Sequence, residues 1–432
     1  MRAAETPPGK GTKFTHKPFS SLHIVWLCAI VQTTNKEGGL VLSMKSTMTI
    51  RLDFGRGSFH ANAHITCPQN RKKRLTFALN NDLTITSLTG NVPVTFRKAG
   101  EASLPFRPLA QRVEITGSGP VKEAVIEYEG SVQFDPAQRK NWNNIITEDI
   151  VSMNWYSIWY PQELSVRLSH GKIIVLHGQH WVVVKAACNR ENGTWEYGSN
   201  GVDPYNIVAY RKEKLQVISN RYMNIYTVDS SIAAIAQTAQ RAYQQVMEYY
   251  NGNLFRKKKL PVLDVTCIAP AISIPEAAYQ RKGLMWCSSI GSNEIEAARL
   301  LAHETAHNWC RGADCNSWED WLNETTAEWS VLLFALRAHQ KALFDAVLIP
   351  KLERYGSLPP IRTPDGSRPE GVHDKGTVLF YQIYQATDCE TMEKTVRCFS
   401  QLIVKNTRNF LRQLRLIGLA NVADLIERGL TE

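Results

Sequence analysis

The chain has 432 residues, of which 44% are hydrophobic and 21% charged, and its formal net charge is +10. These proportions are those of a folded globular protein, and they exclude a disordered, fibrous or collagen-like chain. The length predicts two or three domains of roughly 100–200 residues, with enough apolar material for a core that needs no disulfide scaffold.

Residues 1–47 show no sustained hydrophobic period, and we interpret them as a flexible tail or targeting segment. Their apolar stretch, Leu22–Val31, is far shorter than the roughly 20 residues of a membrane-spanning helix. It fits the h-region of a signal peptide, although no small-residue cleavage site follows. Nine scattered cysteines do not form a secreted disulfide framework and are expected as buried thiols. We expect a cytoplasmic protein with no integral membrane segment, or a secreted one if residues 1–34 act as a signal peptide.

Positive charge is concentrated in this tail and in the run RKKK at 256–259. Such clusters bind nucleic acid or acidic surfaces in some proteins. No nucleic-acid-binding motif accompanies either cluster, so we interpret both as solvated segments and expect no nucleic-acid partner.

From residue 48 to about residue 206 the sequence predicts strands and turns. Apolar and polar residues alternate at 75–79 and 83–88, on either side of an Asn-Asn-Asp turn. Further short runs of strand character lie at 124–128, 173–176 and 181–184. Short strands at this spacing are typical of a β-sandwich or saddle, so we expect an all-β N-terminal domain over 48–206.

Helical spacing of apolar residues takes over beyond residue 206. Helices are predicted at 230–250, 293–310, 320–339 and from 376 to the end, with a strand at 260–265 and a proline-rich loop at 358–368. Asn293 followed by Glu296 is the capping-box pattern that starts a helix. The prediction is a multidomain α+β protein, with an α/β domain at 207–345 and a helical continuation of that domain at 346–432.

The segment with the most chemical content is HETAH, residues 303–307, which lies in a predicted helix. Two histidines four residues apart, His303 and His307, share a helix face, so both imidazoles can bind one ion. The carboxylate between them, Glu304, can take a proton from a water on the open position of that ion. HExxH recurs by chance in long chains, but a capped helix with an apolar opposite face favours one zinc ion over two ordinary histidines.

A catalytic zinc ion needs a third protein ligand, and Glu324 in the next predicted helix is the best candidate. Glu319 and Asp320, in the connecting segment, are alternatives that spacing does not exclude. Asn323 and Glu328 are candidates to support the ligands, because Glu328 can accept a hydrogen bond from a ligand histidine. An exposed helix glutamate is an equally good interpretation of Glu328.

The run HETAHNW at 303–309, followed by WLNE at 321–324, resembles the aminopeptidase N and leukotriene-hydrolase family of gluzincin metallopeptidases, which shows HELAHQW and WLNEGFA. Outside these two motifs the similarity to the family is weaker, and with it the resemblance covers about 380 residues. It implies a thermolysin-like catalytic domain behind the β domain, with His303, His307 and Glu324 as zinc ligands. It also implies Glu304 as general base and a peptide or protein as substrate, and it leaves the oligomeric state open.

Four departures from that family bear on activity. The spacer between His307 and Glu324 holds 16 residues, two fewer than usual. Gln280 stands where the GxMEN motif has the glutamate that binds a substrate amine, with Glu276 as a nearby substitute. His373, in HDKG, stands where the YxKG motif has its catalytic tyrosine; a histidine can also donate to an oxyanion, or be a loop residue with no role. The large C-terminal helical domain of the family is absent, which should open the cleft to longer peptides.

The sequence therefore predicts an aminopeptidase-like zinc metallopeptidase whose preference for exo- or endo-cleavage is open. Two other functions compete with it: a non-catalytic scaffold that keeps its zinc, and a zinc hydrolase of a non-peptide substrate. The retained Glu304 argues against the scaffold, because a purely structural zinc ion needs no general base.

Overall fold

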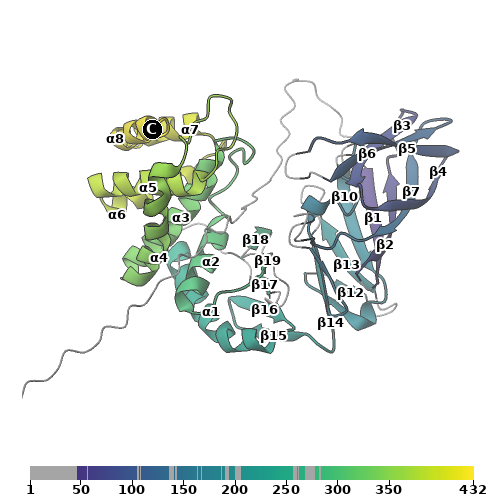
Figure 1. Ribbon diagram of the computed structural model, residues 1–432, viewed down its shortest axis with the longest axis horizontal. Helices are drawn as coiled ribbons and strands as arrows, with labels where there is room; N and C mark the ends of the chain where they lie inside the picture. The colour runs from purple at the N-terminus through teal and green to yellow at the C-terminus, as the bar shows by residue number, and fades with distance from the viewer. Residues whose placement is uncertain are drawn as a thin grey trace, which may run out of the picture.

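The computed structural model describes residues 46–432, except for 56, 105–106, 108, 136–140, 142–143, 163, 167, 186, 190–193, 200–205, 256–259, 261, 268–277 and 282–283. The predictions for residues 1–45 of the N-terminal tail, for the basic run and for Glu276 therefore fall outside the described residues, whereas residues 46 and 47 already belong to the first strand. Strands come first along the chain and helices follow, and the two groups lie side by side (Figure 1).

The N-terminal part is built of two main sheets. The larger has the order β12 (Ala187–Asn189), β13 (Thr194–Ser199), β10 (Leu168–Val175), β1 (Ser46–Phe54), β2 (Phe59–Thr66), β7 (Glu123–Gly130) and β4 (Thr84–Gly90). The smaller has the order β3 (Arg74–Asn80), β6 (Ala110–Gly117) and β5 (Val94–Glu101). Alternate residues of β2 and β7 are buried, and they share one core with the apolar side chains of β3 and β6. Each sheet thus covers one face of the other, and the predicted β-rich N-terminal part is confirmed.

The predicted strand-turn-strand at 75–88 is not a hairpin. β3 pairs with β6, whereas β4 pairs with β7 in the other sheet. The buried side chain of Asn80 explains the change of sheet: its Nδ2 donates to Ser157 O at 2.6 Å, and its Oδ1 accepts from Asp82 N at 2.9 Å. The turn therefore carries the chain from one sheet to the other.

A third sheet connects the two parts of the molecule. It has the order β11 (Trp181–Val183), β14 (Ile207–Arg211), β9 (Ile150–Met153) and β8 (Ile145–Ile146). Since β14 pairs with β9 and β11, the N-terminal part runs to Arg211, beyond the boundary predicted at 206. The reason is that β14 is apolar and buried along almost its whole length. Its Tyr210 packs in one cluster with Trp286 of the following part.

The second part begins with a five-stranded sheet and two helices. The sheet has the order β15 (Gln216–Ser219), β16 (Met223–Thr227), β17 (Leu263–Cys267), β19 (Leu284–Cys287) and β18 (Ala278–Arg281). α1 (Ser230–Tyr249) and α2 (Glu294–Ala306) cover it through one shared apolar cluster. Asn293 caps α2 as predicted, because its side chain accepts from Glu296 N at 3.0 Å. α2 ends at Ala306, four residues earlier than predicted, and the chain turns at His307.

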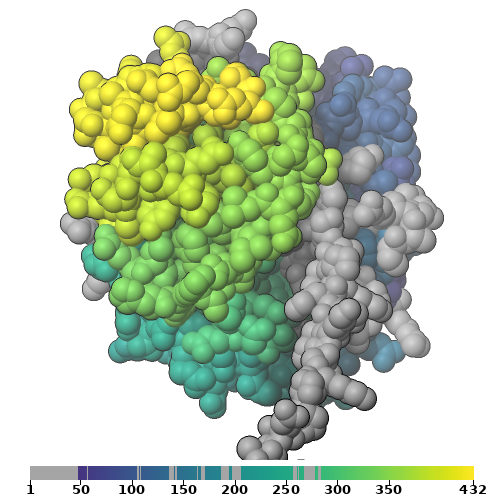
Figure 2. Space-filling model, turned by 60° about the vertical axis from the view of Figure 1, so that its left-hand side comes forward, coloured from purple at the N-terminus to yellow at the C-terminus, as the bar shows by residue number. Residues whose placement is uncertain are grey.

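Six helices complete the chain: α3 (Asp320–Arg337), α4 (Lys341–Arg354), α5 (Val372–Ala386), α6 (Cys389–Gln401), α7 (Thr407–Leu416) and α8 (Ala420–Gly429). α3 is the central one, and it packs against α2, α4, α5 and α6. The short helical turns are η1 (Trp155–Ser157), η2 (Gly178–His180), η3 (Tyr250–Leu254) and η4 (Tyr355–Ser357). One apolar cluster runs from the end of α1 to α8, and Figure 2 shows the residues coloured green to yellow as one continuous body. The predicted division at 345 falls inside α4 and separates no independent core.

Across the residues that the structure describes, no helix has the length and apolar character needed to cross a bilayer. Among the described cysteines, those that are free thiols, most of them buried, are Cys67, Cys287, Cys310, Cys315, Cys389 and Cys398.

Candidate metal centre

The two predicted motif segments meet where α2 crosses α3. His303 lies in the last turn of α2, and His307 is the residue at which that helix ends. Glu324 lies in the second turn of α3, whose residues 320–335 are all buried. All three side chains are buried, with exposed fractions of 2%, 5% and 0%. The packing of α2 against α3 thus brings a carboxylate to the two imidazoles.

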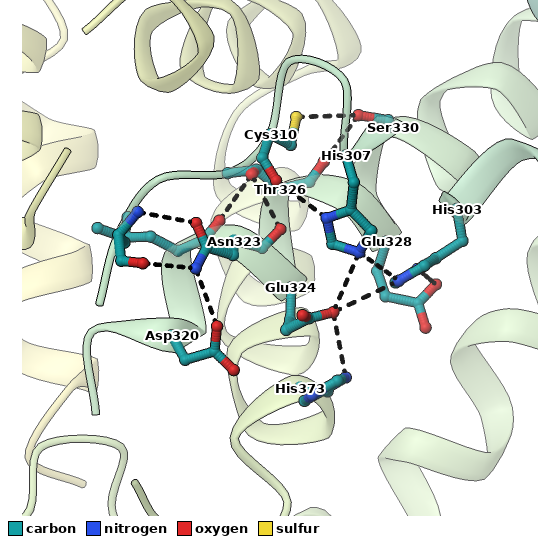
Figure 3. A network of polar contacts seen from close by, with 12 residues as sticks. His303, His307, Cys310, Asp320, Asn323, Glu324, Thr326, Glu328, Ser330 and His373 are labelled. Carbon is teal, nitrogen blue, oxygen red and sulfur yellow. Dashed lines mark hydrogen bonds and ion pairs between the residues drawn. The ribbon is translucent and has the colours of Figure 1, made fainter. Parts of the chain in front are cut away.

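The donor atoms of these residues form a nearly regular triangle (Figure 3). The two imidazole Nε2 atoms are 3.1 Å apart, and Glu324 Oε2 lies 3.4 Å from His303 Nε2 and 3.5 Å from His307 Nε2. Ligands at three corners of a tetrahedron around zinc, at metal–ligand distances of about 2.0–2.2 Å, stand about 3.4 Å from one another. The triangle therefore has the size of a zinc site with one position left open.

The outer nitrogens of both rings face hydrogen-bond acceptors. His307 Nδ1 lies 3.0 Å from Cys310 O, and a carbonyl oxygen only accepts, so Nδ1 carries the proton. His303 Nδ1 lies 3.5 Å from Glu328 Oε2, again an acceptor. In neutral rings both Nε2 atoms then hold lone pairs that point at each other and at a carboxylate. This donor set fits a bound zinc ion, whose charge removes the repulsion.

Glu328 is not an exposed helix glutamate. Its Oε1 lies 2.9 Å from the Nζ of Lys351, a buried residue of α4, while its Oε2 faces His303. Burial raises the pKa of the Glu328 carboxyl, but the charges of Lys351 and His303 outweigh it and hold the pKa well below its usual range. Glu328 is therefore an ionised acceptor beside His303.

Asn323 supports the loop before α3 rather than the imidazoles. Its Nδ2 donates to Ala313 O and its Oδ1 accepts from Ala313 N, both at 3.1 Å. Nδ2 also donates to Asp320 Oδ1 at 2.9 Å. The side chain thus fixes the connection between α2 and α3.

The two alternative ligands proposed from the sequence face other partners. Glu319 Oε2 accepts from the backbone N and the Oγ1 of Thr407, at 2.7 and 2.6 Å, at the start of α7. Asp320 Oδ2 accepts from Arg368 Nε at 2.8 Å. Of these carboxylates, Glu324 is the one whose oxygen faces both imidazoles.

His373 lies at the edge of the triangle, in the first turn of α5. Its Nδ1 stands 3.5 Å from Glu324 Oε2, and its Nε2 stands 2.7 Å from Arg368 Nη2. Burial lowers the pKa of His373 to about 4; the charge of Glu324 opposes this shift, whereas the charges of Arg368 and Lys351 add to it. The ring is therefore neutral, and it is part of the site rather than of a loop.

Glu304 and Gln280 lie on neighbouring elements. Glu304 is 2% exposed and follows His303 on α2. Gln280 is in β18, an edge strand that packs beside α2, and its side chain is buried. Glu276 falls outside the described residues, so its relation to the site stays a prediction.

Two residues of this site carry no sequence signal. Lys351 belongs to a helix whose lysines would ordinarily be exposed, and Arg368 belongs to the proline-rich loop. Both reach the site only because α4 and that loop fold back over α3, which is a non-local event.

Comparisons with known proteins agree with this geometry at the level of fold. The structure resembles an M1 zinc metallopeptidase from Deinococcus radiodurans with a TM-score of 0.58, a mutant of it with 0.59, and a mutant bound to a Tyr-Ser-Ala substrate with 0.57. Sequence identity is 13% in each case, and the matches cover 90% of this chain and 93–94% of those chains. A scan against protein-family models finds no match, and neither does a search of curated proteins. The chain therefore shares the fold of these M1 enzymes.

Proposed function

We propose that this chain is a zinc-dependent metallopeptidase in which His303, His307 and Glu324 hold one zinc ion. The observation that carries the proposal is the triangle of donor atoms, with edges of 3.1–3.5 Å, around which both rings turn their lone pairs inward. The fold shared with M1 zinc metallopeptidases supports a peptide or protein as the substrate. In this proposal the site is of the gluzincin type on a thermolysin-like domain, close to the aminopeptidase N and leukotriene-hydrolase branch.

Each residue then has one task in hydrolysis. A zinc ion held by two neutral imidazoles and one carboxylate would keep a positive charge, and it would supply a lowered pKa to a bound water and polarise a carbonyl. Glu304 takes the proton of the attacking water and delivers it to the leaving amine. Glu328, ionised beside Lys351, holds the ring of His303 with Nε2 directed inward.

His373 is proposed to stabilise the oxyanion. Its Nδ1 faces the oxygen of Glu324 that also faces both imidazoles, so a donor at Nδ1 lies at the edge of the reaction site. A neutral imidazole can donate there without adding a second positive charge to the site. This role replaces that of a tyrosine hydroxyl.

Substrate binding is proposed to involve Gln280 and Glu276. An amide such as that of Gln280 accepts a hydrogen bond from an ammonium group but forms no ion pair with it. We therefore expect aminopeptidase-like binding in which a free amino terminus helps less than it would beside a carboxylate. Peptides with a blocked amino terminus should also be cleaved.

The test compares Tyr-Ser-Ala with its N-acetylated form, with and without a chelator, for the wild type and for Glu304→Gln. We expect chelator-sensitive hydrolysis of both peptides by the wild type. Glu304→Gln should keep its zinc and lose activity by about 10²–10⁴-fold, because the general base is gone. Unchanged turnover of Glu304→Gln would refute that assignment.

Two further substrate sets, a peptide library and a series of esters, separate the two competing functions. The replacements at Gln280 and His373 are the observations that favour them. Zinc-containing protein that cleaves no peptide of a library would favour a binding scaffold. Chelator-sensitive hydrolysis of ester substrates alone would favour a zinc hydrolase of non-peptide substrates.

A further inference from the structure

His373 can replace a tyrosine hydroxyl as a hydrogen-bond donor only if its proton is on the nitrogen that faces the site. A neutral imidazole carries one proton on either of two nitrogens, and only a proton on the inward nitrogen can serve the site. His373 turns Nδ1 inward, 3.5 Å from Glu324 Oε2. The ring is useful as a donor only if Nδ1 holds the proton.

Arg368 determines that position. Its Nη2 lies 2.7 Å from His373 Nε2, and a guanidinium group can only donate. Nε2 must therefore accept with its lone pair, which leaves the proton on Nδ1. The threonine at position 377 helps to fix the same turn of α5, because its hydroxyl donates to His373 O at 2.7 Å.

Arg368 is itself held rigidly. Its Nε donates to Asp320 Oδ2 at 2.8 Å, and Asp320 is a fully buried residue at the start of α3. A bridge between Ser317 and Ser367 ties the loop of Arg368 to the segment before α3. The guanidinium is thus placed by two independent connections to the same region.

The positive charge of Arg368 also accounts for a second group of possible metal-ligand atoms. Asp320, Glu324 and His373 bring donor atoms within 4.8 Å of one another, which is close enough for an ion. Arg368 already contacts two of these three residues. A protein cation therefore supplies the positive charge that this cluster needs, beside the zinc triangle.

We propose that Arg368, anchored by Asp320, is a positioning residue that fixes His373 as the tautomer with its proton on Nδ1, directed at the zinc site. The inference rests on the proposed function for its catalytic consequence, but the tautomer itself is a property of the folded chain. Arg368 acts through His373 and touches no substrate.

The test uses Arg368→Met and a matched control, Arg362→Met. Arg362 belongs to the same loop and is similarly half-buried, but it stacks over the Trp318 ring at 4.9 Å. In zinc-loaded protein, Arg368→Met should lower kcat about tenfold or more and change KM by less than about twofold, with zinc content unchanged. Arg362→Met should match the wild type in all three quantities. Asp320→Asn, which keeps the shape of its side chain, should lower kcat in the same direction.

Nitrogen NMR of protein labelled with ¹⁵N-histidine reads the tautomer directly, with His373→Asn used to assign the signals. We expect the wild type and Arg362→Met to show a protonated Nδ1 and an unprotonated Nε2, and Arg368→Met to show a mixture. Arg368→Lys should restore part of the wild-type pattern, because an ammonium group also only donates.

Two outcomes would overturn the inference: a proton on Nε2 in the wild type, or an unchanged tautomer and kcat in Arg368→Met. If the wild type hydrolyses no peptide but shows the expected tautomer in NMR, the proposed function fails while the assignment of Arg368 stands. Failure of the proposed function is therefore distinguishable from failure of the assignment of Arg368.

Discussion

Gly376 of α5 lies directly against Thr325 of α3: a Cβ added to the glycine would stand 1.9 Å from Thr325 Oγ1. The missing side chain lets the two helices approach closely at this point. Glu324 is the neighbour of Thr325, and His373 lies one helical turn before Gly376. The close crossing therefore sets the distance between the carboxylate of Glu324 and the ring of His373.

We predict that Gly376→Ala destabilises the protein. The methyl group has no space beside Thr325, and overpacking of this kind typically costs about 1–3 kcal/mol. Chemical denaturation should show the loss as a lower midpoint. Gly356→Ala is the control, because nothing lies within 4 Å of a Cβ at that glycine. Equal midpoints for the two variants would show that the helices do not cross as described.

Glu324→Ala should lower the zinc content of the purified protein. The variant removes the only carboxylate of the triangle, and two imidazoles alone hold zinc weakly. Elemental analysis measures the effect. Glu319→Gln should keep its zinc, because Glu319 faces Thr407 at the start of α7. Full zinc occupancy in Glu324→Ala would move the third ligand to another carboxylate.

Lys351→Met should leave the carboxylate of Glu328 buried without its cation. Removing one partner of a buried ion pair typically costs about 3–5 kcal/mol, and loss of a group that orients a ligand weakens metal binding about 10–100-fold. Denaturation and zinc competition measure these effects, and adding Glu328→Gln should recover part of the stability. Asp374 also loses its 3.0 Å hydrogen bond from Lys351 but keeps Arg354 as a partner, so most of the loss falls on Glu328.

Lys341→Met is the control for that experiment. Lys341 lies on the same helix, but its pair with Asp345 is exposed, and such pairs contribute less than about 1 kcal/mol. A loss of stability in Lys341→Met as large as in Lys351→Met would contradict the special role of the buried lysine.

We expect the buried Lys405 to make the free energy of unfolding rise with pH in alkaline solution. Its Nζ donates to Trp309 O at 2.8 Å, just after the HETAH segment, and burial lowers its pKa to about 8. Between pH 8 and the ordinary lysine pKa of about 10.4, the unfolded chain binds the proton more tightly than the folded one. The free energy of unfolding should therefore rise with pH across this interval, relative to Lys405→Met. A difference between the two proteins that stays constant from pH 8 to pH 10 would contradict the lowered pKa.

The sequence predicted local features well, because they depend on residues close together in the chain. Asn293 caps α2 as its pattern indicated, and the four-residue spacing of the histidines put both rings on one face. Glu324 was expected near the two histidines because it lies in the helix that directly follows theirs in the sequence.

Features that depend on how distant segments fold together were missed. Arg368 and Lys351 reach the site only through the return of the proline-rich loop and α4 over α3. α5 begins at Val372 instead of residue 376, so His373 is helical, because Gly371 takes a φ of +64° and turns the chain into the helix. The separation of β3 and β4 into two sheets depends on a buried contact of Asn80 with Ser157, far along the chain.

Anomalous X-ray scattering at the zinc absorption edge tests most directly whether His303, His307 and Glu324 hold one metal ion. In crystals of the zinc-treated protein, the account predicts one strong peak about 2.0–2.2 Å from the Nε2 atoms of His303 and His307 and from the carboxylate of Glu324. A map with no peak among these three side chains, or with zinc bound only by other residues, would contradict it.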